Sequence, residues 1–243
     1  MFVHGLGGCK THFEQAFIEA PPGMGILAVD LPGFGESDRF PPGVEYSFEN
    51  HSAALSEVLV KTAEECGVAT VFLTMHSMSS GILPELLVPS FPSLSGVALL
   101  EGNIIPEDAF WSKRIVKMGD AEFLKYFSSL QNGGHYALAA ELKAQRSPSE
   151  LKYLAACYSL ADYRAFRETA SHALAVSTGG LIAKALKSFS GPKLYFRGSE
   201  SPTWTGWPLL LEAGVSWLTI ENAAHFPHLD NPKQTYSSIY VNH

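Results

Sequence analysis

The chain has 243 residues, of which 46% are hydrophobic and 17% are charged, and its formal net charge is -7. This length suits one domain, or one domain with a subdomain inserted into it. The acidic balance and the absence of a basic run in the sequence argue against nucleic-acid binding. Such a composition is typical of soluble enzymes that act on neutral or apolar small molecules.

The cysteines and the N-terminal residues indicate the cellular compartment of the protein. Cys9, Cys66 and Cys157 are widely spaced and form neither a CxxC pair nor a zinc-binding pattern. We therefore expect free thiols in a reducing compartment. No secretory signal is visible, and no apolar run approaches the ~20 residues that span a membrane. These features predict a cytoplasmic protein, and they leave open whether it forms a homodimer.

Short apolar runs alternate with amphipathic stretches along most of the chain, a pattern that predicts βα units and a parallel sheet. The expected strands are rich in Val, Ile, Leu and Phe, as strands buried on both faces are. They cover residues 2–3, 26–29, 70–74, 95–100, 193–196 and 217–220. Residues 47–66 carry one apolar stripe at helical spacing, with Ser47 and Gly67 as the expected caps.

The strand pattern is interrupted after the fourth expected strand. Helices are predicted near residues 107–117, 120–130, 135–145, 148–175 (broken) and 180–187, with a capping box that starts at Ser147. The segment is also rich in aromatic side chains. We therefore expect a core of residues 1–102 and 188–243, with an all-helical lid inserted at 103–187. Trp111, Tyr126 and Tyr158 are the lid aromatics expected to line a substrate pocket.

Residues 70–81 predict a nucleophile elbow, because a buried strand runs directly into small residues and then a helix. This turn would lift Ser77 out of the sheet and place it at a helix N-terminus, where free N–H groups stabilise an anion. The usual pattern has glycine two residues before the serine, where this chain has Met75. An alternative frame makes Ser79 the nucleophile, but it places that serine two residues into the helix.

Two further segments are expected to supply the oxyanion hole and the catalytic base. The glycines of residues 4–8, His-Gly-Leu-Gly-Gly, would let the chain turn back, so that the N–H of Leu6 joins that of Met78 in an oxyanion hole. His225 follows the last expected strand, from where it can reach Ser77 and take its proton. His228 is a second candidate for this base, whereas His76 is expected to point away from the site.

Together, these segments resemble the α/β-hydrolase family in its lidded branch. The resemblance rests on HGLGG at 4–8, DLPGFGESD at 30–38, HSM at 76–78 and AHFPHLDNP at 224–232, and it covers essentially the whole chain. It implies a mostly parallel, twisted sheet flanked by helices, with the active site at the carboxyl ends of the strands. The chain begins at what corresponds to the family's third strand, without the first β-hairpin, so we expect the strand at 26–29 at the sheet edge.

The acid of the expected triad is the least regular part of the pattern. Members of the family usually carry Asp after the strand placed at 193–196, but Ser201 occupies that position here and Glu200 lies one residue early. Some relatives take the acid from the preceding strand end, where this chain has Glu101. We therefore expect a Ser77-His225-Glu101 triad, with Glu200 as the alternative acid.

Several reactions would suit such a site. The first hypothesis is hydrolysis of a small hydrophobic ester or lactone through an acyl-enzyme on Ser77. A thioesterase, a hydrolase of carbon–carbon bonds, a cofactor-free lyase or haloperoxidase-like chemistry could use the same groups. A ligand receptor of the same fold is the non-catalytic alternative. No metal or organic cofactor is implied by any of these readings.

Overall fold

The computed structural model describes residues 1–87 and 94–242. It contains one six-stranded sheet in the order β2-β1-β3-β4-β5-β6, and all neighbouring strands pair in parallel. The strands are β1 (Phe2–Val3), β2 (Ala28–Val29), β3 (Val71–His76), β4 (Leu94–Leu100), β5 (Lys193–Gly198) and β6 (Ser216–Ile220). The predicted parallel sheet is confirmed, and β2 lies at its edge as expected.

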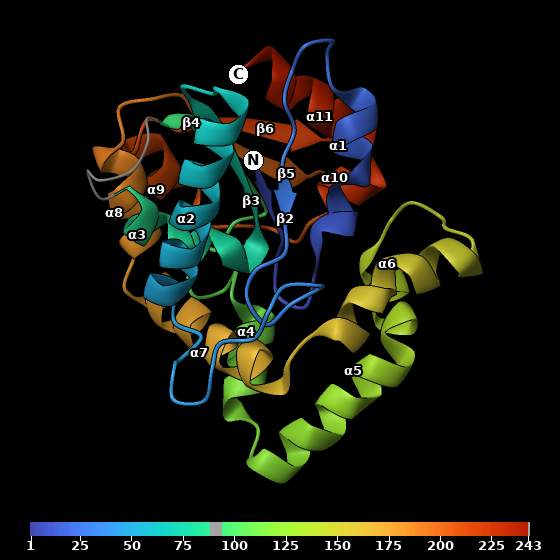
Figure 1. Ribbon diagram of the computed structural model, residues 1–243. Helices are drawn as coiled ribbons and strands as arrows, with labels where there is room; N and C mark the ends of the chain where they lie inside the picture. The colour runs from blue at the N-terminus through green and yellow to red at the C-terminus, as the bar shows by residue number, and fades with distance from the viewer. Residues whose placement is uncertain (88–93, 243) are drawn as a thin grey trace.

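Side chains alternate between two apolar clusters along the strands. In β4, Val97 and Leu99 belong to the larger cluster, whereas Ala98 and Leu100 belong to the smaller one. The larger cluster extends to α2 (Phe48–Cys66), α3 (Leu83–Leu86) and α8 (Leu181–Ser188), and the smaller one to α1 (Glu14–Glu19) and α11 (Pro232–Val241). Helices therefore cover both faces of the sheet (Figure 1), which explains why the strands are apolar on both sides.

The predicted caps are formed. Ser47 accepts a hydrogen bond from the N–H of Asn50, and Gly67 ends α2 with a φ of 64°. Ser147 and Glu150 form the capping box of α6 (Pro148–Leu160). Asn231 caps α11, which begins at Pro232. Local side-chain chemistry therefore sets these helix boundaries, and at Ser47, Gly67 and Ser147 it does so as the sequence indicated.

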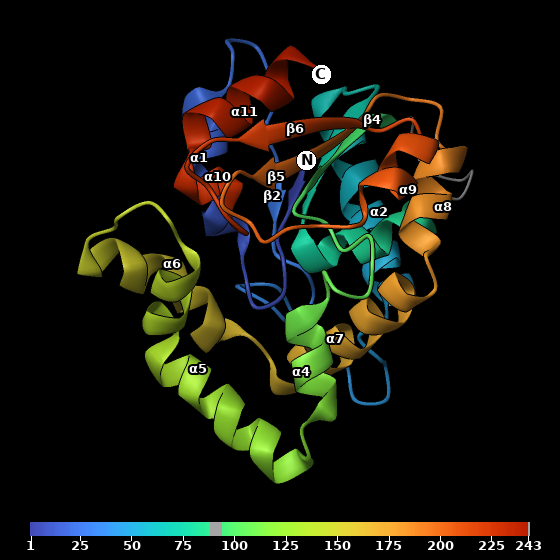
Figure 2. The same ribbon diagram turned by 180° about the vertical axis from the view of Figure 1, so that it is seen from behind.

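The segment expected to form the lid is helical in the structure. It comprises α4 (Phe110–Lys117), α5 (Asp120–Glu141), α6, α7 (Tyr163–Thr178) and α8. Two predicted helices merge into α5, which has a non-helical residue at Gly133. Helices α5 and α6 pack side by side and α4 packs against α7 (Figure 2). Helix α6 contacts the core directly, through Leu154 with His12 and through Tyr153 with Glu14. Helix α8 instead contacts α3 and α9 (Trp207–Glu212) of the core.

Three short helices follow strands of the sheet. They are η1 (Lys10–Phe13) after β1, η2 (Ser77–Ile82) directly after β3, and α10 (Pro227–Asp230) after β6. All three follow the carboxyl ends of their strands. Their N-terminal residues therefore gather at one edge of the sheet, where ligands bind in open parallel sheets.

Candidate active site

Ser77 stands at a strained turn between β3 and η2. Its φ of 52° lies in the left-handed region, which residues other than glycine rarely adopt. Such strain is typical of functional positions. The hydroxyl of Ser79, by contrast, is buried and donates to the backbone carbonyls of Val3 and His76. The geometry thus favours Ser77 over Ser79 as the nucleophile.

Met75, which stands where the usual elbow pattern has glycine, is accommodated in the core. Met75 is fully buried and pairs with Val3 and Leu99 on the neighbouring strands. The backbone that packs closely against the elbow is that of Gly5. A Cβ on Gly5 would lie 2.8 Å from Nδ1 of His76 and 3.1 Å from Cβ of Ser77. A larger residue at position 5 would therefore displace the elbow.

His225 reaches Ser77 from the loop after β6. Its Nε2 lies 3.0 Å from Oγ of Ser77, the geometry of a general base that takes the hydroxyl proton. Burial, together with the smaller effect of the positive charge of Arg197, lowers the pKa of His225 to about 4. The imidazole is therefore neutral at pH 7 and can accept a proton.

Two contacts hold the loop that carries His225. The ring of His76 lies behind it and donates from Nε2 to the backbone carbonyl of His225 at 2.8 Å. Asp230 accepts from the N–H of Ala224 at 3.0 Å and also from the N–H groups of Lys143 and Ala144 in the lid. The loop is thereby fastened to both the sheet and the lid.

His228 occupies the other side of His76. Its ring is fully buried, lies 4.6 Å from the His76 ring and stacks on Phe13 at 4.9 Å. Neither of its ring nitrogens has a hydrogen-bond partner among the described residues. It is therefore a packed core residue rather than a surface or lid contact, and the structure brings His225, not His228, to Ser77.

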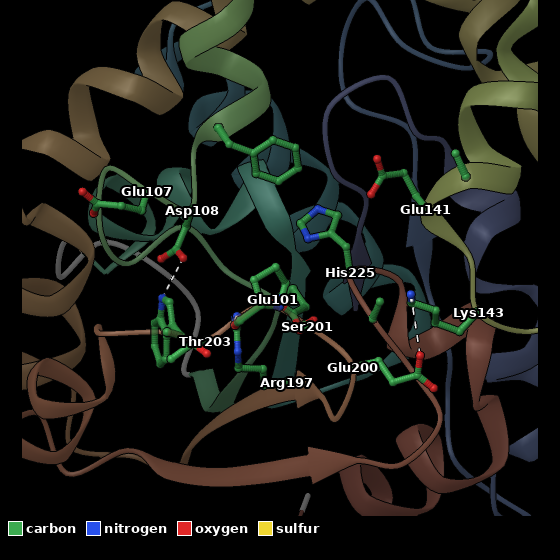
Figure 3. Close-up of a pocket in the computed structure, with 15 residues that line it drawn as sticks. Glu101, Glu107, Asp108, Glu141, Lys143, Arg197, Glu200, Ser201, Thr203 and His225 are labelled. Carbon is green, nitrogen blue, oxygen red and sulfur yellow. Dashed lines mark hydrogen bonds and ion pairs between the residues drawn. The ribbon is translucent and has the colours of Figure 1, made fainter.

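Glu101 ends β4 and is 6% exposed. Its Oε1 accepts from the N–H of Gly198 at 2.8 Å and from Oγ of Ser201 at 2.6 Å, while Oε2 pairs with Arg197 at 2.9 Å. Burial raises the pKa of Glu101, and Arg197 opposes this effect. No hydrogen bond joins Glu101 to His225 in the described part of the chain, although both side chains line one cavity of 460 Å³ (Figure 3).

Glu200, the alternative acid, lies elsewhere on the rim of the same cavity. Its carboxylate pairs with Lys143 of the lid at 3.6 Å, and its side chain is half-exposed. It therefore bridges the core and the lid in this structure. Neither candidate acid donates to or accepts from the imidazole of His225.

The two residues expected to supply the oxyanion donors both lie beside Ser77. Leu6 and Met78 line a cavity of 20 Å³ together with Ser77 and His225. The N–H of Leu6 takes part in no backbone hydrogen bond among the described residues. Met78 is the second residue of η2, where N–H groups lack intrahelical partners.

The loop that presents Leu6 is held by its neighbours. The imidazole of His4 donates from Nδ1 to the carbonyl of Gly5 at 2.8 Å, and its Nε2 accepts from the N–H of Leu31 at 3.0 Å. Asp30 accepts from the N–H of Lys10 at 2.6 Å, just beyond this loop. Hydrogen bonds between side chains and backbone N–H groups therefore join the motif at 30–38 to the loop at 4–8 and to Lys10 just after it.

A cavity of 340 Å³ lies under the lid beside His225. Trp111, Tyr126 and Tyr158, the three aromatics predicted for the pocket, all line it. The indole of Trp111 donates to the hydroxyl of Tyr126. Tyr158 is buried, and Gly7 packs against its ring. The lid and the loop that carries His225 and Phe226 thus enclose this cavity together.

The expectation for the cysteines was wrong. Cys9 and Cys157 form a disulfide with their Cα atoms 5.5 Å apart, and only Cys66 is a free thiol. The two residues are separated by 148 positions in sequence, so their spacing carried no sign of the pairing. The bond joins the residue after the loop at 4–8 to lid helix α6.

Residues that the sequence did not single out also shape the site. Phe110 lines all three cavities, Arg197 pairs with Glu101, and Asp230 fastens the His225 loop. Their roles depend on contacts distant in sequence. Within residues 1–87 and 94–242, no group of three or more His, Cys, Asp and Glu side chains could hold a metal ion. No helix of that same part is long and apolar enough to cross a membrane.

Comparisons with known proteins show the family to which the chain belongs. The model of the Alpha/beta hydrolase family matches residues 1–238. The chain belongs to this family. A comparison with curated protein sequences found no match.

Solved structures with similar folds include a bromoperoxidase from Bacillus anthracis and an esterase from Exiguobacterium antarcticum. The bromoperoxidase is 16% identical with a TM-score of 0.73, and the match covers 99% of this chain and 89% of the other. The esterase is 17% identical with a TM-score of 0.71, and the match covers 99% and 90%. A thermophilic esterase from Thermogutta terrifontis is 17% identical with a TM-score of 0.68, covering 99% and 87%. At these identities the likeness supports the fold, and this hydrolase's substrate must be argued from its own site.

Proposed function

We propose that this hydrolase cleaves a small hydrophobic ester or lactone through an acyl-enzyme on Ser77. The observation that carries the proposal is the 3.0 Å contact between Oγ of Ser77 and Nε2 of His225, at a residue held with a φ of 52°. A nucleophile within hydrogen-bond reach of a neutral base is the arrangement that activates serine.

The reaction follows from this arrangement. Oγ of Ser77 attacks the ester carbonyl as its proton passes to Nε2 of His225. The N–H groups of Leu6 and Met78 stabilise the negative charge on the carbonyl oxygen. His225 then donates the proton to the leaving alcohol, and a water molecule activated by the same imidazole hydrolyses the acyl-enzyme. Glu101 is the proposed acid, and its carboxylate would orient the imidazole of His225.

The experiment that tests the proposal combines labelling with turnover. A fluorophosphonate should modify Ser77, as mapped by peptide analysis, and a short p-nitrophenyl ester should be hydrolysed. Ser77→Ala should lose both, and His225→Ala should lower the turnover by several orders of magnitude. An adduct on Ser79, or labelling of Ser77 without turnover of any ester, lactone or thioester, would contradict the proposal. The second result would favour a receptor.

A further inference from the structure

Phe110 stands where three cavities meet. It is the first residue of α4, it is 53% exposed, and its ring faces that of His225 edge-on at 5.9 Å. Phe110 and His225 are the two residues that line the cavity at Ser77, the 460 Å³ cavity and the 340 Å³ cavity alike. A ring at this point can determine how a substrate at Ser77 extends in either direction.

The two larger cavities differ in chemistry. The 340 Å³ cavity, here called the aromatic cavity, is lined mainly by apolar and aromatic side chains, among them Trp111, Tyr126, Tyr158 and Phe226. Arg114 and Glu141 also line it, and Glu141 lies between it and the second cavity. The 460 Å³ cavity, here called the charged cavity, is lined by Glu101, Glu107, Asp108, Glu141, Lys143, Arg197 and Glu200. Figure 3 shows these charged side chains placed around His225.

The charged cavity has an excess of acidic groups. Arg197 pairs with Glu101 at 2.9 Å and Lys143 with Glu200 at 3.6 Å, so both cations are matched by a carboxylate. The carboxylates of Glu107, Asp108 and Glu141 remain beyond these two pairs. A negatively charged substrate group would be repelled there, whereas a neutral polar or cationic group would be accepted.

We propose that Phe110 divides a two-part substrate site, with an apolar group of the substrate in the aromatic cavity and a polar, non-anionic group in the charged cavity. The inference rests on the proposed function, because it places the reacting carbonyl at Ser77. Phe110 lies between the cavity at Ser77 and both larger cavities, so the size of its side chain limits what can lie on both sides at once.

The test uses three esters of 4-phenylbutyric acid, made with choline, with 2-methoxyethanol and with glycolic acid. Their leaving groups are cationic, neutral and anionic. Wild-type protein should hydrolyse the first two with a kcat/KM at least ~10-fold above that of the glycolate ester, a difference set by charge complementarity. Glu107→Gln combined with Glu141→Gln should reduce this ratio several-fold.

Phe110→Ala should join the cavities, and it should raise kcat/KM for esters that are bulky on both sides relative to short esters. Phe110→Leu should have a smaller effect in the same direction. Tyr136→Ala is the matched control, because Tyr136 is an exposed aromatic of α5 that lines neither cavity. It should leave the order of substrates unchanged.

The outcomes of these tests distinguish failure of the two-part site from failure of the proposed function. If Ser77 is labelled but the Phe110 variants rank esters as the wild type does, or if the glycolate ester is hydrolysed best, the two-part site is overturned while the proposed function stands. If no ester is hydrolysed and Ser77 is not labelled, both are overturned.

Discussion

Oγ of Ser201 donates to the carboxylate of Glu101 at 2.6 Å. Ser201 holds the position, after β5, at which the family usually carries the triad acid. The contact therefore places the carboxylate of Glu101, which comes from the end of β4, beside the position of the usual acid. This relationship is the main support for Glu101 as the group that orients His225, even though its present partners are Arg197, Gly198 and Ser201.

We expect Glu101→Gln to lower the kcat of a good ester by at least ~10²-fold, because loss of the acid leaves the imidazole in the wrong tautomer and removes charge that stabilises the imidazolium. The measurement is steady-state turnover of a p-nitrophenyl ester, with folding checked by circular dichroism. Glu200→Gln is the control and should remain within a few-fold of wild type. A large loss only in the Glu200 variant would assign the acid to the loop after β5.

Moving the carboxylate from position 101 to position 201 also tests whether Glu101 is the acid of the triad. Glu101→Gln combined with Ser201→Asp should recover at least ~10-fold of the activity lost in Glu101→Gln, because an acid at 201 restores the charge beside the histidine. Ser201→Asp alone should be destabilised, since two carboxylates would share one buried site. If the double variant is no more active than Glu101→Gln, the neighbourhood of Glu101 and Ser201 has only a structural role.

Acid should destabilise the protein between about pH 6.5 and pH 4. Burial lowers the pKa of His4 to about 4 and that of His51 to about 3, so both stay neutral while the unfolded chain takes up protons. The stability that they contribute is present above the unfolded pKa of about 6.5 and is lost as the pH falls towards the folded values. Each should lower the free energy of unfolding by about 2 kcal/mol between pH 7 and pH 5.

Denaturant unfolding at pH 7, 6 and 5 measures this loss. His51→Phe removes one buried imidazole among the rings of Phe34, Phe40 and Tyr46, and it should flatten the pH dependence. His135→Gln, at a partly exposed position on α5, is the control and should leave the slope unchanged. An equal slope in His51→Phe would mean that other groups cause the acid instability.

The fold could be predicted from sequence to within a few residues at each strand. Buried parallel strands are continuous apolar runs, and caps such as Ser47 and Ser147 mark helix ends by local hydrogen bonds. The predicted break between residues 120–130 and 135–145 coincides with a kink in α5 at Gly133, whose φ of -140° is not helical. Local patterns therefore indicated the elements and also this break within α5.

The sequence predicted only those site residues that lie in short local motifs. Ser77, His225, Leu6 and Met78 lie in short segments with distinctive residues, and the structure brings them together. The ion pair of Arg197 with Glu101 and the disulfide of Cys9 with Cys157 join residues about 100 or more positions apart. A single sequence contains no signal for such pairs, since their proximity is created by the fold.

Met75 should act in stability rather than in catalysis. It is fully buried between β1 and β4, so Met75→Ala should lower the free energy of unfolding by about 3 kcal/mol through the cavity that it leaves. Met75→Leu should cost less than ~1.5 kcal/mol, because volume is conserved. Both variants should retain fluorophosphonate labelling of Ser77. A loss of labelling in Met75→Leu would instead show that the methionine shapes the elbow.

The disulfide between Cys9 and Cys157 should stabilise the closed arrangement of lid and loop. It encloses a segment of 148 residues that includes the elbow, and chain entropy alone assigns such a closure roughly 5 kcal/mol. Thiol titration of the native protein should find one reactive group, Cys66, and titration after denaturation and reduction should find three. Cys157→Ser should lower the midpoint of thermal unfolding, and a dithiol reductant should lower that of the wild type but not that of the variant. Cys66→Ser is the matched control and should behave as wild type in both tests. Three titratable thiols in the unfolded but unreduced protein would show that the bond does not form, and the cost of Cys157→Ser would then reflect packing alone.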